Sequence, residues 1–310
     1  MKSISTYLRQ SFSTTLNNNW LMNILFFLAA YLAYSVICLI CSLILAVPMV
    51  LIAMVTGGAG FFFYALLTIL FLAWMLIVYP PLFYGIQITF LEVARGENIN
   101  FSNLFCGYHK RIIKPLALKW FYLMAACLAG LILWLIIQMP FSNPTAIPQA
   151  LDDASLPFWS YLLLLILFIP FYFLYYSLSM TENVLYDYQY GITKFEEEEQ
   201  LEEEEELSSS QILSISKRLM QGHKLKLFLL DLCFGGINIA ILAIGILLMF
   251  ALGEATGGLG AILLGIMLLI ALPTIISASL TAHGYFYNDL VGYEDRGTDF
   301  AEEEVEDNNN

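Results

Sequence analysis

The chain has 310 residues, of which 59% are apolar and 13% are charged, and its formal net charge is −13. Soluble globular proteins carry about 25% charged residues, so this composition excludes a soluble enzyme. It also excludes a disordered or fibrous chain, because the apolar residues form long uninterrupted runs. The composition therefore predicts an integral membrane protein.

Six segments are long and apolar enough to cross a bilayer, since a helix needs about 20 apolar residues to span a hydrocarbon core of about 30 Å. In chain order the predicted spans are Trp20–Val47, Phe61–Phe90, Leu118–Met139, Phe158–Met180, Leu227–Leu252 and Gly258–Thr281. The first two exceed the length of a perpendicular span, so either Pro48 and the Pro80–Pro81 pair kink them or their ends lie in the headgroup layer. The expected fold class is all-α: a polytopic integral membrane protein whose six transmembrane helices form three hairpins.

The distribution of positive charge predicts the orientation. Every Lys and Arg lies before span one, between spans two and three, between spans four and five, or after span six; the connections near 57–60, 140–157 and 253–257 carry none. Since cytoplasmic loops carry an excess of Lys and Arg, both termini are predicted to be cytoplasmic. The first apolar run is longer than a signal-peptide core and no cleavage site follows it, so the first helix is expected to remain in the mature protein.

A short amphipathic segment precedes each odd-numbered span. These segments are expected to be helices at the membrane interface over residues 1–19, near 102–114 and near 208–222, with the apolar face toward lipid and Lys or Arg toward the headgroups. Their apolar positions are Ile4, Tyr7, Leu8 and Phe12, then Leu104, Phe105, Tyr108 and Ile112, then Ile212, Ile215 and Leu219. The chain then divides into the N-terminal interfacial helix, a membrane domain over 20–292 and an acidic disordered tail over 293–310.

The even-numbered spans share a pattern near their inner ends. The segment 87–92, Gln-Ile-Thr-Phe-Leu-Glu, aligns with 177–182, Ser-Leu-Ser-Met-Thr-Glu, and with 277–281, Ser-Ala-Ser-Leu-Thr. One interpretation is a parallel internal repeat of about 90 residues, each unit being an interfacial helix and a two-span hairpin. The alternative is convergence among three helices that end at the same membrane surface.

Four stretches of the chain resemble a known family: Arg95–Phe105, Tyr176–Met180, Ser216–Phe228 and Thr281–Leu290. They are similar to uncharacterised bacterial integral membrane proteins catalogued as domain of unknown function 975, which are distantly similar to the membrane domain of glycerophosphodiester phosphodiesterases. The resemblance covers most of the chain from about Pro80 onward. It implies a multi-pass protein of the bacterial cytoplasmic (inner) membrane with no assigned activity, and it does not extend to a phosphodiesterase catalytic domain. The chain departs from the family by an acidic insert after Tyr190.

The acidic insert at 194–207 contains the runs Glu196–Glu199 and Glu202–Glu206. Such like charges repel one another, which favours a solvated spacer. Two functional interpretations stay open. The insert either competes with anionic lipid for nearby cations or loosely collects metal ions on its carboxylates.

Ionisable residues in or beside the spans are costly and therefore informative. Asp231 lies inside span five, Glu92 and Glu182 lie at the inner ends of spans two and four, and His283 lies at that of span six. All four are expected at one depth, near Lys119, Lys224 and Lys226. They form either a shared polar site or interfacial ion pairs that fix the depth of the helices.

Common catalytic motifs are absent from the sequence, which argues against an enzyme. The sequence has no HExxH, GxGxxG, P-loop or GxSxG motif, and its histidines are scattered. The Cys38–Cys41 CxxC lies on a lipid-embedded helix, so no metal site, cofactor or structural disulfide is expected. We expect no catalytic residues and no nucleic-acid partner.

The leading hypothesis is a non-enzymatic protein that binds membrane lipids, anionic lipids among them, or a membrane-protein partner or second copy of itself. The binding candidates are the cations Lys110, Arg111, Lys114, Lys217, Arg218, Lys224 and Lys226. The alternative is a transporter or channel for an apolar or zwitterionic solute, which requires a polar cavity lined by Gln87, Thr89, Ser177, Ser179, Ser277 and Ser279.

Overall fold

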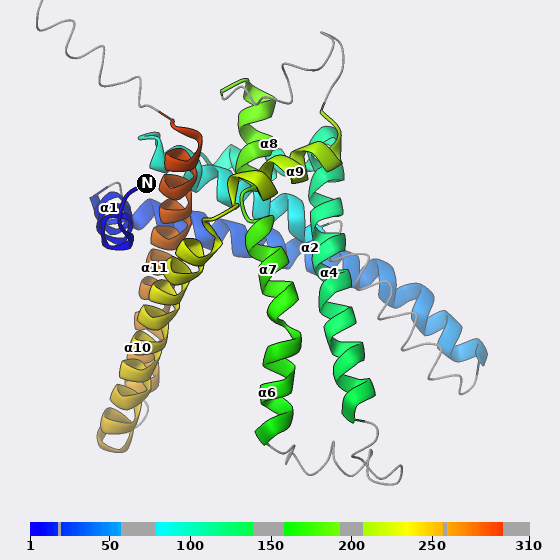
Figure 1. The fold of residues 1–310 in the computed structure, drawn as a ribbon. Coiled ribbons are helices and arrows are strands. Elements are labelled where there is room, and N and C mark those ends of the chain that lie inside the picture. The colour runs from blue at the N-terminus through cyan, green and yellow to red at the C-terminus, as the bar shows by residue number, and fades with distance from the viewer. Residues whose placement is uncertain (18–19, 57–77, 139–157, 193–206, 257–258, 294–310) are drawn as a thin grey trace, which may run out of the picture.

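The computed structural model describes residues 1–17, 20–56, 78–138, 158–192, 207–256 and 259–293. Within these ranges every regular element is a helix, as Figure 1 shows, which confirms the predicted all-α class. The elements are α1 (Ile4–Asn17), α2 (Trp20–Thr56), a helix over 78–94, the 3-10 helix η1 (Phe101–Tyr108), α4 (Lys110–Gln138), α6 (Phe158–Leu167), α7 (Ile169–Ser177), α8 (Thr181–Tyr190), α9 (Ser209–Leu219), α10 (Lys224–Thr256) and α11 (Leu259–Val291).

Four described stretches are long and apolar enough to cross a membrane: Trp20–Leu39, Lys110–Trp134, Leu162–Tyr190 and Lys224–Leu247. Their mean hydropathy is 2.0 or higher. The chain is therefore membrane-embedded. Much of the predicted second span, residues 61–77, lies outside the described residues. The predicted sixth span, Gly258–Thr281, falls within α11 except for Gly258, which is also outside them.

The predicted fourth span, Phe158–Met180, is not one continuous helix. It is divided into α6 and α7 at Phe168, and Pro170 occupies the first turn of α7. Proline lacks a backbone N–H and cannot continue the hydrogen-bond pattern of the preceding helix. A second break at Leu178–Met180 separates α7 from α8, so the inner end of this span is a turn followed by a polar helix.

The three amphipathic segments pack on protein rather than lying apolar face down on lipid. In α1, Tyr7 is fully buried, and the Phe12 ring lies 5.7 Å from that of Phe234 on α10. In α9, Ile212 and Ile215 are buried in the same hydrophobic cluster as Tyr7. The apolar face of an amphipathic helix can be buried against lipid or against protein. Here it is buried against the ends of the long helices.

The predicted interfacial helix near 102–114 is replaced by two elements. Residues 101–108 form η1, whose N-cap Asn100 accepts the Ser102 amide, and α4 begins at Lys110. The reason is close packing of η1 on the 78–94 helix. A Cβ added to Gly107 would lie 2.2 Å from the Pro81 carbonyl oxygen, so only glycine permits this approach.

The third amphipathic segment forms the helix that its pattern predicts. Ser208 and Gln211 make a reciprocal capping box at the start of α9. The helix ends at Leu219, and Gly222 follows with a φ of +83° in the turn that leads into α10. Because α10 begins at Lys224, its first lysines stand on the first turn of a membrane helix.

The hydrophobic core lies at one end of the described structure. We call this end the cap: α1, η1, α8, α9 and the adjoining ends of the 78–94 helix, α4, α10 and α11, which enclose the largest buried cluster. From the cap, α4 with α6 and α7, and α10 with α11, extend in the same direction (Figure 1). At most 22% of the residues in each candidate span are buried. The spans therefore present most of their apolar surface outward, and the cap holds them together.

Candidate functional site

The polar residues predicted at the inner ends of the spans lie in and under the cap, where each has a partner. Lys119 on α4 donates from Nζ to Glu182 on α8, with Nζ–Oε distances of 2.5 and 2.6 Å. Both side chains are buried, at 3% and 0% exposure. Each charge is therefore compensated by the other, which is the condition for burying either of them.

Asp231 and His283 form a second pair. The His283 Nε2 atom lies 2.6 Å from an Asp231 carboxylate oxygen, which joins α10 to α11. Tyr176 on α7 also hydrogen-bonds to Asp231. Unlike the Lys119–Glu182 pair, these side chains are partly accessible, at 16% for His283 and 25% for Asp231.

Glu92 has a separate set of partners. The Tyr186 hydroxyl donates to it over 2.7 Å, and the Asn103 amide of η1 donates to its other oxygen. Burial raises the pKa of the Glu92 carboxyl above its ordinary value, although these two hydrogen bonds act in the opposite direction. The residue ties the 78–94 helix to both η1 and α8.

A buried ion pair between Arg95 and Asp187 was not predicted from the sequence. The Arg95 guanidinium donates two hydrogen bonds to the Asp187 carboxylate, of 2.7 and 3.0 Å. Its Nε donates to Asn288, and the Tyr287 hydroxyl donates to Asp187 over 3.0 Å. A signal was present in the sequence: Asp187 lies between Tyr186 and Tyr188, and a carboxylate among aromatic residues needs a partner.

The Arg95 network joins the three proposed repeat units. Arg95 follows the 78–94 helix, Asp187 belongs to α8, and Tyr287 and Asn288 belong to α11. Two further contacts tie α1 to the end of α11. Tyr7 donates to Asp289 over 2.7 Å, and the Lys2 amide donates to the same carboxylate over 2.9 Å.

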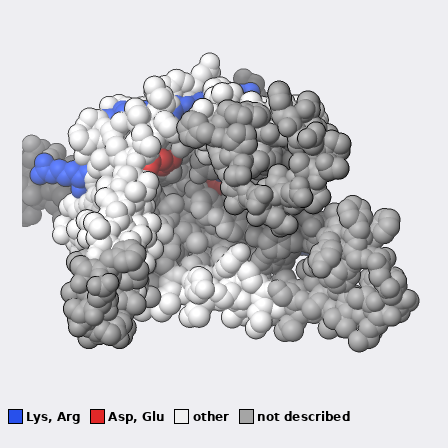
Figure 2. Space-filling view, turned by 90° about the horizontal axis from the view of Figure 1, so that it is seen from below, with Lys and Arg blue, Asp and Glu red and all other residues white. Residues whose placement is uncertain are grey.

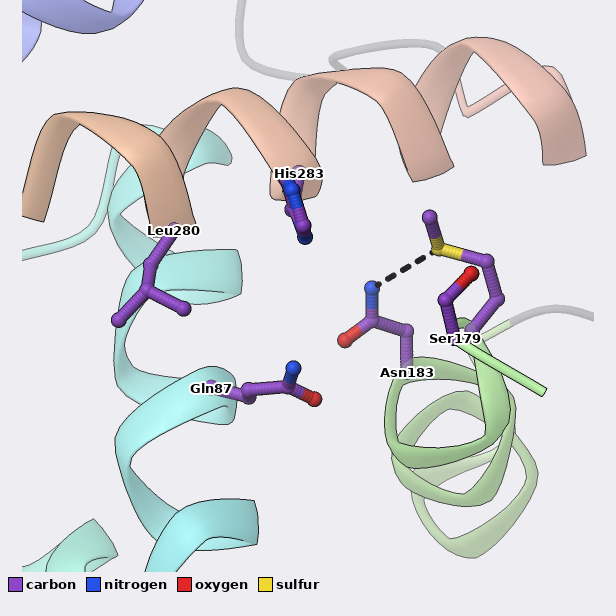
Figure 3. Close-up of a pocket in the computed structure, with 7 residues that line it drawn as sticks. Gln87, Ser179, Asn183, Leu280 and His283 are labelled. Atoms are coloured by element: carbon purple, nitrogen blue, oxygen red, sulfur yellow. Dashed lines mark hydrogen bonds between the residues drawn. The ribbon is translucent and has the colours of Figure 1, made fainter. Parts of the chain in front are cut away.

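A small pocket lies where the three aligned segments meet, as Figure 3 shows. Its cavity volume is about 10 Å³, which is room for about one water molecule. The 78–94 helix supplies Gln87, the turn before α8 and its first residues supply Ser179, Met180 and Asn183, and α11 supplies Leu280, His283 and Gly284. The predicted shared polar site is therefore present only in part, because His283 lines this pocket whereas Glu92, Glu182 and Asp231 are not among its lining residues.

Most hydroxyls that the transport hypothesis placed on a polar path bond to their own helices. Thr89, Ser177 and Ser277 are buried and donate to the carbonyls of Gly85, Phe173 and Pro273, over 2.7 to 2.9 Å. Ser179 donates to Tyr176, although it also lines the pocket. Of the six predicted residues, only Gln87 and Ser179 line the described pocket.

The predicted binding cations fall into two groups. Lys110, Arg111, Lys114, Lys217 and Arg218 are exposed on the cap. Lys224 and Lys226 are partly buried: the Lys224 ammonium lies 3.6 Å from the centre of the Phe173 ring, and Lys226 donates to the Lys2 carbonyl. Figure 2 shows the separation of charge, with Lys and Arg at the edge of the described part and Asp or Glu in a recess between helices.

Other predictions are only partly covered by the described residues. The acidic insert at 194–207 and the tail at 293–310 lie almost wholly outside them. Among the described residues no group of three His, Cys, Asp or Glu side chains is placed to hold a metal ion, and Cys38, Cys106, Cys127 and Cys233 are free thiols. Comparison of the chain with protein-family models, curated proteins and solved structures finds no match.

Proposed function

We propose that this chain is a non-enzymatic membrane protein that binds anionic lipid through the exposed lysines of the cap, with a membrane-protein partner or second copy as a further ligand of the same surface. The observation that carries the proposal is the division of charge. Five carboxylates of the cap and the adjoining helix ends, Glu92, Glu182, Asp187, Asp231 and Asp289, accept hydrogen bonds from inside the protein, whereas Glu97 is an exposed carboxylate. Lys110, Lys114 and Lys217 instead point outward.

The position of two of these lysines favours an anionic ligand. Lys110 and Lys114 occupy the first turns of α4, a helix that is apolar enough to cross the membrane. A helix N-terminus carries a partial positive charge, so lysines there reduce helix stability and, together with the free amides, attract an anion. A phosphate in the headgroup layer supplies that charge, at about 1 kcal/mol for each lysine near the surface.

The proposal includes six spans with both termini on the cytoplasmic side. The two crossings beyond the four apolar stretches are α11 and the predicted second span, Phe61–Phe90, whose last part belongs to the helix over 78–94. The contacts of Lys2 and Tyr7 with Asp289 support placing the two ends of the chain at the same membrane surface. The bacterial inner membrane, and kinship with domain of unknown function 975, are proposed from the resemblance of the sequence motifs alone.

The test is lipid retention by the purified protein in native mass spectrometry. A triple Lys110→Gln, Lys114→Gln, Lys217→Gln variant is compared with the corresponding triple Lys→Arg variant, which keeps the charge. We expect retention of phosphatidylglycerol to fall by about fivefold per lysine in the Gln variant, equivalent to about 1 kcal/mol each, and to persist in the Arg variant. Equal retention of phosphatidylglycerol by both variants would overturn the proposal.

A second candidate, the transport of an apolar or zwitterionic solute, is favoured by one observation: Gln87 and Ser179 face a pocket at the meeting point of the three segments. Its test is solute flux in reconstituted vesicles. Flux that is abolished by Gln87→Leu, with normal lipid retention, would favour transport over lipid binding.

A further inference from the structure

Two groups of apolar helices extend from the cap and meet where α7 contacts α10 (Figure 1). At this junction the Lys224 ammonium lies over the Phe173 ring. One turn further along α10, the Phe228 ring packs edge-on against that of Tyr176, with ring centres 5.8 Å apart, and Tyr176 also hydrogen-bonds to Asp231. Lys224, Phe228 and Asp231 follow one another at intervals of three or four residues, so one face of α10 makes these contacts.

Beyond the junction the same face of α10 is unpaired in the part of the chain that the structure describes. Gly235 lies four residues after Asp231, and a Cβ added to it would meet no described atom within 4 Å. Leu242 continues the face and is 38% exposed. On the other helix Ile169 lies one turn before Phe173 and is 60% exposed. The two helices therefore separate at Gly235, and both have exposed apolar side chains there.

Two cations stand at the cap end of this face. Lys217 lies in the last turn of α9 and Lys224 begins α10, and they are close enough for their charges to act on each other. Neither forms an ion pair with a carboxylate of the described residues, whereas Lys119 is paired with Glu182. The Phe173 ring attracts the Lys224 ammonium but carries no net charge. Two neighbouring positive charges are thus left without an anion.

Charge and surface together select the class of ligand. Two uncompensated cations favour a phosphate, and the unpaired apolar face beyond them favours a hydrocarbon chain joined to that phosphate. Lys224 and Gly235 are about 16 Å apart along the helix, at about 1.5 Å per residue. One leaflet is half of a hydrocarbon core of about 30 Å, so an acyl chain whose phosphate lies at Lys224 reaches the level of Gly235.

We propose that an anionic phospholipid binds at the α7–α10 junction, with its phosphate at Lys217 and Lys224 and one acyl chain along the α10 face at Gly235. The inference rests on the proposed function for the class of ligand, and it adds the position and the orientation of one bound lipid. The acyl chain then supplies the packing partner that the face of α10 lacks beyond Asp231.

The experiment measures retention of phosphatidylglycerol relative to phosphatidylcholine by the full chain in native mass spectrometry. We expect a Lys217→Gln, Lys224→Gln variant to lower the relative retention about 25-fold, which corresponds to about 1 kcal/mol for each lysine. Gly235→Leu fills the space of the acyl chain and should also lower retention of phosphatidylglycerol. The matched control is Gly236→Leu, because a Cβ at Gly236 likewise meets no described atom within 4 Å but lies on another side of α10; it should retain lipid as the wild type does.

Combining the changes tests whether the lysines and Gly235 contact the same lipid molecule. Gly235→Leu should have no further effect in the Lys217→Gln, Lys224→Gln variant, but it should keep its full effect in a Lys110→Gln, Lys114→Gln variant. The proposal is overturned if Lys217→Gln, Lys224→Gln keeps the relative retention of the wild type, if the two glycine variants behave alike, or if the effects of Gly235→Leu and the Lys217→Gln, Lys224→Gln changes add. Unchanged retention in Lys110→Gln, Lys114→Gln would count against lipid binding at the start of α4 and would leave this site standing.

Discussion

Replacing Lys119 with Met removes the charge opposite Glu182 and leaves a flexible side chain that still fills most of the space. The Nζ–Oε1 distance of 2.6 Å gives an attraction of about 6 kcal/mol at an effective dielectric constant of about 20. Desolvation of the two buried ions offsets much of this attraction. Removal of one partner is nevertheless expected to cost about 3–5 kcal/mol, because Glu182 is left buried and unpaired.

Thermal unfolding in detergent, followed by tryptophan fluorescence, measures this effect. For a chain of this size each kcal/mol shifts Tm by roughly 2–4 °C, so Lys119→Met should lower the apparent Tm by about 10 °C. The double variant Lys119→Met, Glu182→Leu should recover most of the loss, because apolar residues often replace a buried ion pair without a net cost.

The matched control is Lys114→Met, an exposed lysine on the same helix, for which we expect a change within about 0.5 kcal/mol. The reasoning is refuted if Lys119→Met unfolds within about 2 °C of the wild type. It is equally refuted if the double variant loses the full sum of the two single changes, because the charges would then not be compensating each other.

Three further changes test the packing and charge of the cap. Gly107→Ala brings a Cβ against the Pro81 carbonyl and should destabilise the protein by about 1–3 kcal/mol or more. The control Gly235→Ala, whose Cβ meets no described atom within 4 Å, should leave the stability unchanged. An equal Tm for both variants would contradict the packing of Gly107 on Pro81. Burial opposes ionisation of Asp289, but its hydrogen bonds and Lys2 lower its pKa overall, so the stability that Asp289 contributes is present above about pH 4 and is lost as the pH falls through the lowered pKa. In Asp289→Asn, Tm measured against pH should lose this acid dependence. An unchanged pH profile would argue against the contact. Ser208→Ala removes the cap of α9 and should cost about 0.5–2 kcal/mol, seen as faster amide exchange in α9; unaltered exchange contradicts a role for the cap.

The sequence identified the polar positions beside the spans, because a carboxylate next to about 20 apolar residues stands out from its surroundings. It did not identify the partners. Lys119 and Glu182 are 63 positions apart, and their pairing depends on which helices are neighbours in the cap. The Arg95–Asp187 pair was missed for the same reason: the tyrosines beside Asp187 indicate that its carboxylate needs a partner, but not that the partner is Arg95, 92 positions away.

The amphipathic segments show a different limit of the sequence. The spacing of Ile212 and Ile215 predicts an amphipathic helix, and α9 is one. The same spacing does not say whether lipid or protein meets the apolar face, because both are apolar. The structure of the cap shows that the partner is protein, because Ile215 is fully buried there.

The contacts between α1 and the end of α11 have a consequence for biogenesis. Tyr7 and Asp289 are 282 positions apart, and Thr14 bonds to Tyr285 across 271 positions. During synthesis α1 is made before α11, so Tyr7 and Thr14 lack these partners until α11 has been made. The junction between α1 and α11 therefore forms late in assembly of the cap, and a chain truncated before Tyr285 would leave this face of α1 without its partner helix.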